Sequence, residues 1–237
     1  MSSPLITMER LNPFGWLLGV ATSDRRREPA DNIACMNPAI TSAAPDDIET
    51  GFRRGTANDA LCVGVLAVQV FLDTYATAGI RPDLAREALI TCGVEAVRIR
   101  LESANTQFIL AERNHHLVGF AELAIGGAVP DESLAGGIEV VKLYVQRHFK
   151  RLGIGAGLLR HAESIAAANS GECLWLTAWA ENANALRFYA ALGFADIGET
   201  EHVFEDKSYE NRLLVRRFVE PTTRCRGDRP AWRPSSY

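Results

Sequence analysis

Lys150-Arg-Leu-Gly-Ile-Gly155 is the stretch of this sequence that decides the fold. It lies between a valine-rich run, 138–145, that predicts a strand and an amphipathic pattern, starting at Ile154, that predicts a helix. Glycines in such a turn let the backbone approach a ligand closely, and the start of a helix offers unpaired N–H groups and a positive dipole end. Lys150 and Arg151 add positive charge, so the stretch predicts a cradle for a diphosphate-bearing cofactor.

Two other interpretations of this turn stay open. A dinucleotide-binding fold requires G-x-G-x-x-G directly after a strand and an acidic residue about twenty positions further on. Here Gly153, Gly155 and Gly157 have the spacing G-x-G-x-G, and Glu172 lies before the next predicted strand instead of at its end. The remaining interpretation is a glycine-rich turn that binds no ligand.

The patterns on both sides of the turn predict a domain in which helices and strands are mixed. Before the turn we expect a strand at 52–55, a helix that begins at Asn58 or Asp59 and ends at Gly79, a helix from Pro82 to about Arg100, a hairpin of 107–111 with 117–125, and a strand at 138–145. After it we expect a helix that ends at Asn169-Ser-Gly171, a strand at 173–180, a helix at 184–192 capped by Gly193, and a hairpin of 196–203 with 209–218. The apolar stripe of the first helix is predicted to consist of Leu61, Val65, Val68, Leu72 and Tyr75.

The composition excludes several classes of protein. Hydrophobic residues make up 47% of the 237 residues, which predicts a buried core and excludes bulk disorder. The formal net charge of −4 disfavours a general nucleic-acid-binding protein. Five widely spaced cysteines without a C-x-x-C pair predict neither a disulfide framework nor a zinc site, and they favour the reducing cytoplasm. No apolar run reaches the length that spans a bilayer, so no membrane partner is expected.

Both ends of the chain differ in composition from its middle. Residues 1–50 contain repeated prolines and a charge cluster at 24–28, which predicts an irregular N-terminal extension. Within it, Phe14–Ala21 is apolar but short and lacks a basic lead-in, so we expect no signal peptide. Residues 220–237 are rich in arginine and proline, and they predict a disordered basic tail.

Two motifs together resemble one family. Leu143-Tyr-Val145, the glycine turn and Leu158-Leu159 resemble the acetyl-CoA motif of the GNAT superfamily of N-acyltransferases. Asn182-Ala-Asn-Ala-Leu-Arg-Phe-Tyr-Ala-Ala-Leu-Gly-Phe194 resembles the second motif of that superfamily. The resemblance covers residues 51–219 and implies the GNAT acyl-CoA N-acyltransferase fold, a mixed α/β domain with a mostly antiparallel central sheet flanked by helices.

The glycine turn departs from the family pattern at two positions. Lys150 stands where the family usually has arginine or glutamine, and it keeps the charge without the forked hydrogen-bonding geometry. Arg151 stands where the family usually has a small residue. Because backbone N–H groups supply most of the cradle, we expect phosphate binding to persist.

A narrower resemblance is to the PaiA type of polyamine N-acetyltransferase. It rests on four features: Glu139 ahead of Leu-Tyr-Val, Trp175-Leu-x-x-Trp179, the asparagine pair Asn182-x-Asn184, and Asp206-Lys-Ser-Tyr-Glu-Asn-Arg-Leu-Leu-Val215. This resemblance implies an acceptor such as spermidine or spermine.

The family resemblance also implies the cofactor site. Acetyl-CoA is the expected acyl donor, and its pantetheine arm is expected between two splayed strands, those that hold Leu143 and Trp175. The residues expected to bind it are Leu143, Tyr144, Val145, Lys150, Arg151, Leu152, Gly153, Ile154, Gly155, Ala156, Asn182 and Tyr189.

Acetyl transfer to an amine requires two proton transfers. A primary amine with a pKa of about 10 is mostly protonated at neutral pH and must lose a proton before it attacks. The leaving thiolate, in turn, needs a proton. Family analogy gives Tyr189 the role of acid toward the thiolate, although an aromatic residue that only packs its helix would look the same. Glu139 is the expected base, because it lies in an apolar run where burial would raise its pKa. An equally good interpretation is that Glu139 faces solvent and has no role in the reaction. Glu122 is the alternative base. Asn182 is expected to orient pantetheine or water, a role compatible with capping a helix.

The acceptor is not specified by the sequence. We expect direct transfer in a ternary complex to a small-molecule primary amine, a polyamine in the narrower interpretation, with Asp73, Asp83, Glu87 and Glu95 as candidate contacts on the first helices. The alternatives are a protein, amino-acid or antibiotic amine, or an acetyl-CoA-binding regulator whose tail arginines touch nucleic acid. No metal is required, and the oligomeric state, a homodimer included, is left open.

Overall fold

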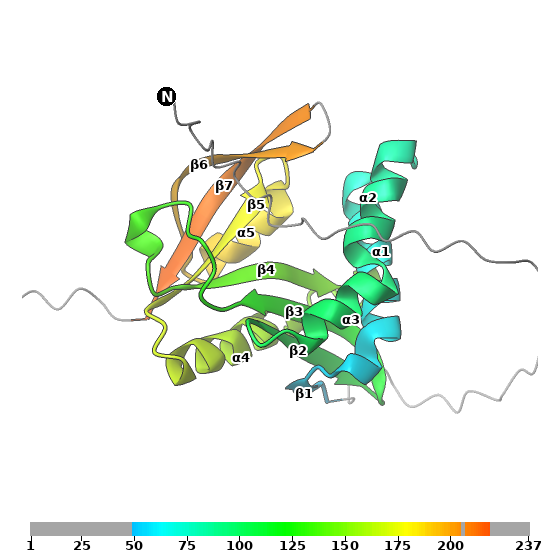
Figure 1. The fold of residues 1–237 in the computed structure, drawn as a ribbon, viewed down its shortest axis with the longest axis horizontal. Coiled ribbons are helices and arrows are strands. Elements are labelled where there is room, and N and C mark those ends of the chain that lie inside the picture. The colour runs from blue at the N-terminus through cyan, green and yellow to red at the C-terminus, as the bar shows by residue number, and fades with distance from the viewer. Residues whose placement is uncertain (1–48, 205–206, 219–237) are drawn as a thin grey trace, which may run out of the picture. The chain divides into compact units, whose positions relative to one another are not determined.

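The computed structural model describes residues 49–204 and 207–218, in which one seven-stranded sheet is flanked by helices on both faces (Figure 1). The strands are β1 (Gly51–Arg54), β2 (Thr106–Arg113), β3 (His116–Ala124), β4 (Ile138–Val145), β5 (Cys173–Trp179), β6 (Ala195–Phe204) and β7 (Lys207–Arg217). Their spatial order is β1-β2-β3-β4-β5-β7-β6, and every neighbouring pair is antiparallel except the parallel pair of β4 and β5. The expected mixed α/β architecture with a mostly antiparallel sheet is therefore confirmed.

The helices form two layers. They are α1 (Ala60–Tyr75), α2 (Pro82–Cys92), α3 (Val94–Glu102), α4 (Ile154–Ala168) and α5 (Ala183–Ala191), with short 3₁₀ turns η1 (Ala57–Asp59), η2 (Glu132–Leu134) and η3 (Arg147–Phe149). One core joins α4 and α5 to one face of the sheet, and a second core joins α1, α2 and α3 to the face that carries Phe108, Leu110 and Phe120. All but the last two residues of the extension expected over 1–50, and the whole tail expected over 220–237, lie outside the described residues.

The hairpin of β2 and β3 shows how local sequence sets the register. Arg113 pairs with His116, so only Asn114 and His115 form the turn. Both have positive φ, 48° and 62°, which is the two-residue turn whose twist matches that of paired strands. Asn tolerates this backbone better than most residues, and the hairpin predicted around this stretch is confirmed.

The helix predicted from Pro82 to Arg100 is wrong in one respect, since it is two helices that meet at Gly93. Gly93 has an extended backbone, with ψ of 152°, and it starts α3. A Cβ at this position would lie 2.3 Å from the carbonyl oxygen of Leu89, so the break requires glycine. The turn between the helices also packs closely on α1, where a Cβ at Gly64 would lie 3.0 Å from the carbonyl oxygen of Cys92. A pattern of apolar residues alone does not reveal such a close approach.

The apolar stripe predicted for α1 is also wrong. Leu61 and Val65 are both 61% exposed, whereas Val63 and the residues in phase with it are buried. The buried set is Ala60, Val63, Gly64, Leu66, Ala67 and Val70. Because α1 contacts α2 and α3 as well as the sheet, these contacts decide which of its apolar residues face inward, and Leu61 and Val65 are left outside.

The statement that no segment could span a membrane needs a correction too. Residues Ala57–Tyr75 are long and apolar enough, by length and composition only, to cross a bilayer. In the structure the buried face of this helix belongs to the second core, which is the ordinary reason for such a composition in a globular domain.

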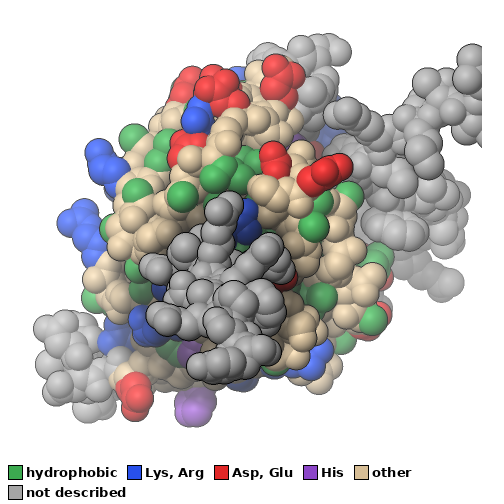
Figure 2. All heavy atoms as spheres, turned by 90° about the vertical axis from the view of Figure 1, so that its left-hand side faces the viewer, with side chains coloured by type: hydrophobic (Ala, Val, Ile, Leu, Met, Phe, Trp, Pro, Cys, Tyr) green, Lys and Arg blue, Asp and Glu red, His purple; other side chains and the backbone are tan. Residues whose placement is uncertain are grey.

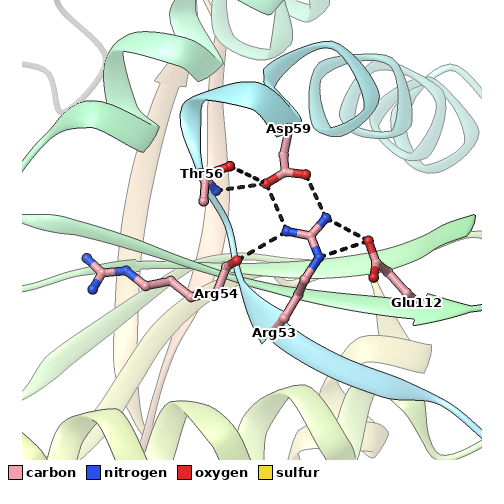
Figure 3. Close-up of polar contacts among 5 residues, drawn as sticks. All are labelled: Arg53, Arg54, Thr56, Asp59 and Glu112. Atoms are coloured by element: carbon pink, nitrogen blue, oxygen red, sulfur yellow. Dashed lines mark hydrogen bonds and ion pairs between the residues drawn. The ribbon is translucent and has the colours of Figure 1, made fainter. Parts of the chain in front are cut away.

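Arg53 fastens the edge strand β1 to the rest of the domain (Figure 3). Its guanidinium donates to both carboxylate oxygens of Asp59, at 2.7 and 2.9 Å, and to Glu112 on β2 at 2.7 and 3.0 Å. Asp59 in turn accepts hydrogen bonds from the backbone N–H and the hydroxyl of Thr56 at 2.8 and 2.9 Å. One arginine thus joins a strand end, the neighbouring strand and the start of the first helical segment.

Candidate active site

The sheet opens into a fork between β4 and β5. The two strands pair only at Ile138 with Leu174 and at Glu139 with Trp175. Beyond these pairs, β4 continues against β3 as far as Val145, and β5 continues against β7 as far as Trp179. Each strand therefore has one edge of backbone N–H and C=O groups without a strand partner, which is the splayed pair that the resemblance implied.

A β-bulge in β4 decides which side chains face which layer. Glu122 pairs with Lys142 and Leu123 pairs with Val140, so Val141 is an extra residue. Such an insertion inverts the alternation of side chains that follow it. Before the bulge, Ile138 and Val140 pack in the core with α4, and after it Leu143 and Val145 do so. Glu139, Lys142 and Tyr144 accordingly face the layer of α1, α2 and α3.

The start of α4 is an open, positively charged cradle. Gly153 precedes the helix with a φ of 76°, and the first helical hydrogen bond of this turn runs from the N–H of Gly157 to the carbonyl oxygen of Gly153 at 2.9 Å. The N–H groups of Ile154, Gly155 and Ala156 therefore lie before that bond, and no acidic residue lies in the first turn. Lys150, Arg151 and Leu152 are exposed beside it.

The unusual arginine in the turn has a structural cost. Arg151 has a φ of 67°, in the left-handed region that favours glycine. Only glycine would adopt this backbone without strain. The backbone of the cradle is kept in spite of the substitution.

Two of the three glycines, Gly155 and Gly157, lie inside α4, whereas Gly153 lies in the turn before it. A Cβ at Gly155 would lie 3.0 Å from the ring of Phe188, and one at Gly157 would lie 2.2 Å from the ring of Phe52. Gly157 therefore allows β1 to pack on the helix, whereas a Cβ at Gly153 would meet no atom within 4 Å. Gly155 belongs both to the cradle and to the contact with α5.

Tyr189 lies on α5 in the core that α4 and α5 form with the sheet, and Asn182 lies at the start of α5. Tyr189 is 8% exposed and packs against Phe188 and Phe194, with ring centroids 5.2 and 5.4 Å away. Burial, and to a smaller extent the phenol of Tyr75, raises the pKa of Tyr189 above its usual value. Asn182 caps the helix, because its Oδ1 accepts a hydrogen bond from the N–H of Ala185 at 3.1 Å.

The two candidate bases have different surroundings. Burial raises the pKa of Glu139 to about 7, with Lys142 opposing and Glu122 adding to the shift, and no described side chain hydrogen-bonds to this carboxyl group. Glu122 is 2% exposed and accepts a hydrogen bond from Arg100 at 2.7 Å and one from Lys142 at 3.1 Å. With both oxygens bound to cations, Glu122 is poorly placed to accept a proton from a substrate.

Three of the acidic residues expected to contact the acceptor have these surroundings. Asp83 is bound by Arg81 at 2.9 Å, Glu95 lies 3.4 Å from Arg98, and Asp73 is exposed on α1. Acidic side chains collect at one end of the face shown in Figure 2, over the hairpin of β6 and β7. There Glu199, Glu201 and Glu210 line a shallow cavity of about 480 Å³ with Thr200 and Ser208. None of the expected site residues lines this cavity.

Sequence reasoning missed an aromatic pair at the fork. Tyr75 ends α1 and Trp179 ends β5, and their ring centroids lie 5.7 Å apart. Tyr75 had been taken as part of a buried stripe, and only the parting of the strands brings it beside Trp179.

Comparisons with known proteins agree with this geometry. Residues 77–194 match the model of the acetyltransferase (GNAT) family. An uncharacterised N-acetyltransferase of Lactobacillus delbrueckii subsp. lactis is 25% identical over 151 residues, which are 64% of this chain and 87% of the relative.

Solved structures share the fold at low sequence identity. The PaiA N-acetyltransferase of Thermoplasma acidophilum, solved with coenzyme A, is 18% identical with a TM-score of 0.60, and the alignment covers 72% of this chain and 99% of that one. A probable acetyltransferase of Staphylococcus epidermidis is 14% identical with a TM-score of 0.59, over 72% and 100% of the two chains. With the family match, the fork and the cradle at α4, these likenesses lead to one conclusion: the chain belongs to the acetyltransferase (GNAT) family and is an N-acetyltransferase.

Proposed function

We propose that this domain transfers an acetyl group from acetyl-CoA directly to a primary amine, in a ternary complex with both substrates. The observation that carries the proposal is the fork between β4 and β5, whose unpaired edges lead from Glu139 toward the cradle at the start of α4. A polyamine is the acceptor that the resemblance to PaiA-type enzymes favours, and the free thiols of Cys62, Cys92 and Cys173 suit the reducing cytoplasm.

The residues present fit the donor. Diphosphate would bind the N–H groups of Ile154, Gly155 and Ala156, with Lys150 and Arg151 beside it. The amides of the pantetheine arm would pair with the open edge of β4, at the main chain of Leu143, Tyr144 and Val145. Leu152 and Gly153 complete the turn, and Asn182 fixes the start of α5 on the other side of the fork.

The chemistry needs one group that accepts a proton and one that donates it. The amine nitrogen forms a bond to the thioester carbonyl carbon while the carbon–sulfur bond breaks. Glu139 accepts the proton that the amine loses, through water, because its raised pKa brings the carboxyl group into the working range. Tyr189 donates to the departing thiolate, since its raised pKa keeps the phenol protonated at neutral pH.

A thiol-release assay tests the proposal, with acetyl-CoA and a panel of spermidine, spermine, lysine, peptides and aminoglycosides. We expect turnover with an amine, and we expect Tyr189→Phe to lower kcat by about ten-fold or more, because a positioned acid typically contributes about 10²- to 10⁴-fold. Calorimetry should show that this variant still binds acetyl-CoA.

Two results would contradict the proposal in different ways. If acetyl-CoA binds but no amine is acetylated, an acetyl-CoA-binding regulator replaces the enzyme. If amines are acetylated but only peptides, amino acids or aminoglycosides react, the acceptor class changes and the chemistry stands.

A further inference from the structure

Tyr75 and Trp179 join two parts of the domain that are more than a hundred residues apart in sequence. Their rings are tilted by 44° with centroids 5.7 Å apart, and Phe71, one turn earlier on α1, lies 4.9 Å from Tyr75. Tyr75 is 40% exposed and Trp179 is partly exposed. The pair therefore presents ring surface to a ligand instead of being sealed in a core.

The pair lies on the same side of the sheet as Glu139. Along β5, Leu174, Leu176 and Ala178 pack in the core with α4, so the alternation of a strand turns Trp179 to the opposite face. Glu139 faces that side too, because its neighbours Ile138 and Val140 belong to the core with α4. An amine that approaches Glu139 from the side of α1 meets the aromatic pair at the end of the fork.

The fork also lets groups on the two faces interact. Tyr189 belongs to the core with α4, whereas Tyr75 lies on the side of α1. The phenol of Tyr75 nevertheless contributes, after burial, to the raised pKa of Tyr189 and to that of Tyr144.

The connection after α1 carries Arg81, which contacts Tyr209 on β7. Its charge is balanced by Asp83, whose carboxylate lies 2.9 Å away. The side of the sheet that faces α1 combines partly exposed ring faces with the half-buried carboxyl group of Glu139.

We infer that Tyr75 and Trp179 are specificity-determining residues, which bind a second cationic group of the acceptor against their ring faces. The face of an aromatic ring is electrically negative and attracts an ammonium group, with tryptophan the strongest of the rings. The inference rests on the proposed function, because it assumes that the amine reacts at the fork. It goes further by naming the side chains that select the acceptor.

The experiment compares two acceptors that differ in one group. Putrescine carries a second ammonium group, and the amino alcohol of the same chain length carries a hydroxyl group in its place. We expect Trp179→Leu and Tyr75→Leu each to raise the KM of putrescine by about three- to ten-fold. The KM of the amino alcohol should change little, so the preference for putrescine falls, while kcat and the affinity for acetyl-CoA stay unchanged.

Conservative variants and a remote control separate recognition from folding. Trp179→Phe and Tyr75→Phe keep an aromatic ring and should retain most of the preference for putrescine. They also provide the test if a leucine variant fails to fold. Leu89→Ala, at a position 68% exposed on α2, should leave the preference unchanged.

Three outcomes decide between the two proposals. An equal rise in KM for both acceptors, or no rise for either, would overturn the role of the aromatic pair and leave the acetyl transfer intact. A wild-type preference for the amino alcohol would overturn that role as well. Binding of acetyl-CoA without acetylation of any amine in the panel would overturn the proposed function itself.

Discussion

Glu122 and Lys142 form an ion pair of 3.1 Å between neighbouring strands, and their residues are only 2% and 7% exposed. The second oxygen of the same carboxylate binds Arg100 on α3 at 2.7 Å. One buried carboxylate thus compensates two cations beside the fork and ties α3 to the strands that carry the site.

Removal of the negative charge should therefore destabilise the domain. Glu122→Gln removes the charge of the carboxylate that Arg100 and Lys142 share, and we expect the free energy of unfolding to fall by about 3 kcal/mol, measured by urea denaturation. Glu95→Gln, at a side chain 77% exposed, is the matched control and should change little. Similar losses in both variants would mean that the buried triad contributes no more than a surface pair.

The base assignment predicts a pH dependence. Because the pKa of Glu139 is raised to about 7, its basic, ionised form gains population as the pH rises through about 7. We expect kcat/KM of the wild type to rise over this range and the rise to vanish in Glu139→Gln. If kcat/KM of this variant still rises over the same pH range, the rise belongs to the titration of another group.

The contact between Asp59 and Arg53 predicts a loss of stability in acid. The hydrogen bond from Arg53 is the main cause that lowers the pKa of Asp59 to about 2. The contribution is therefore complete above the usual carboxyl pKa of about 3.9 and is lost as the pH falls toward about 2. We expect thermal melts of the wild type and Asp59→Asn to converge between these values. Melts of Asp73→Asn, a change at an exposed carboxylate on α1, should follow the wild type throughout.

Two valines on α1 test which face of this helix is buried. Val63 is 0% exposed and Val65 is 61% exposed, although both are valines two positions apart. Val63→Ala should lower the free energy of unfolding by about 2 kcal/mol, and Val65→Ala by less than about 0.5 kcal/mol. A larger loss of stability in Val65→Ala than in Val63→Ala would mean that the apolar stripe predicted from the sequence is the buried face of α1.

Gly157 and Gly153 test two different reasons for a glycine near the start of α4: close packing against a neighbour and a left-handed backbone. A Cβ at Gly157 would lie 2.2 Å from Phe52, so Gly157→Ala should destabilise the domain by about 1–3 kcal/mol through overpacking. Gly153→Ala meets no neighbour and should cost about 1 kcal/mol of backbone strain. If Phe52 is the obstacle, Phe52→Ala combined with Gly157→Ala should cost less than the sum of the two single changes, as a double-mutant cycle measures.

The element order and the mixed sheet followed from sequence because they depend on local signals. The turn at Asn114 and His115, the run of β4 and the cap at Gly193 are each encoded within a few residues. The break at Gly93 and the buried face of α1 depend on contacts between helices, and no local pattern reports those. The bulge at Val141 is likewise a property of pairing with β3.

The cradle could be located from sequence, since its glycines and cations are consecutive. The roles of Glu139, Tyr189 and Asn182 came from resemblance and remain proposals. The aromatic pair could not be foreseen, because Tyr75 and Trp179 meet only after α1 has packed on the sheet and β5 has parted from β4.

Two residue pairs hold the halves of the sheet together between β4 and β5. One half of the sheet is β1 to β4 and the other is β5 to β7; few backbone hydrogen bonds join them directly, and the core with α4 spans both. A molecule lodged between the halves would act as a removable strand, pairing with edges that otherwise end in solvent. Ligand binding should then raise the protection of amide hydrogens in β4 and β5 together, so that the loaded domain unfolds as one cooperative unit.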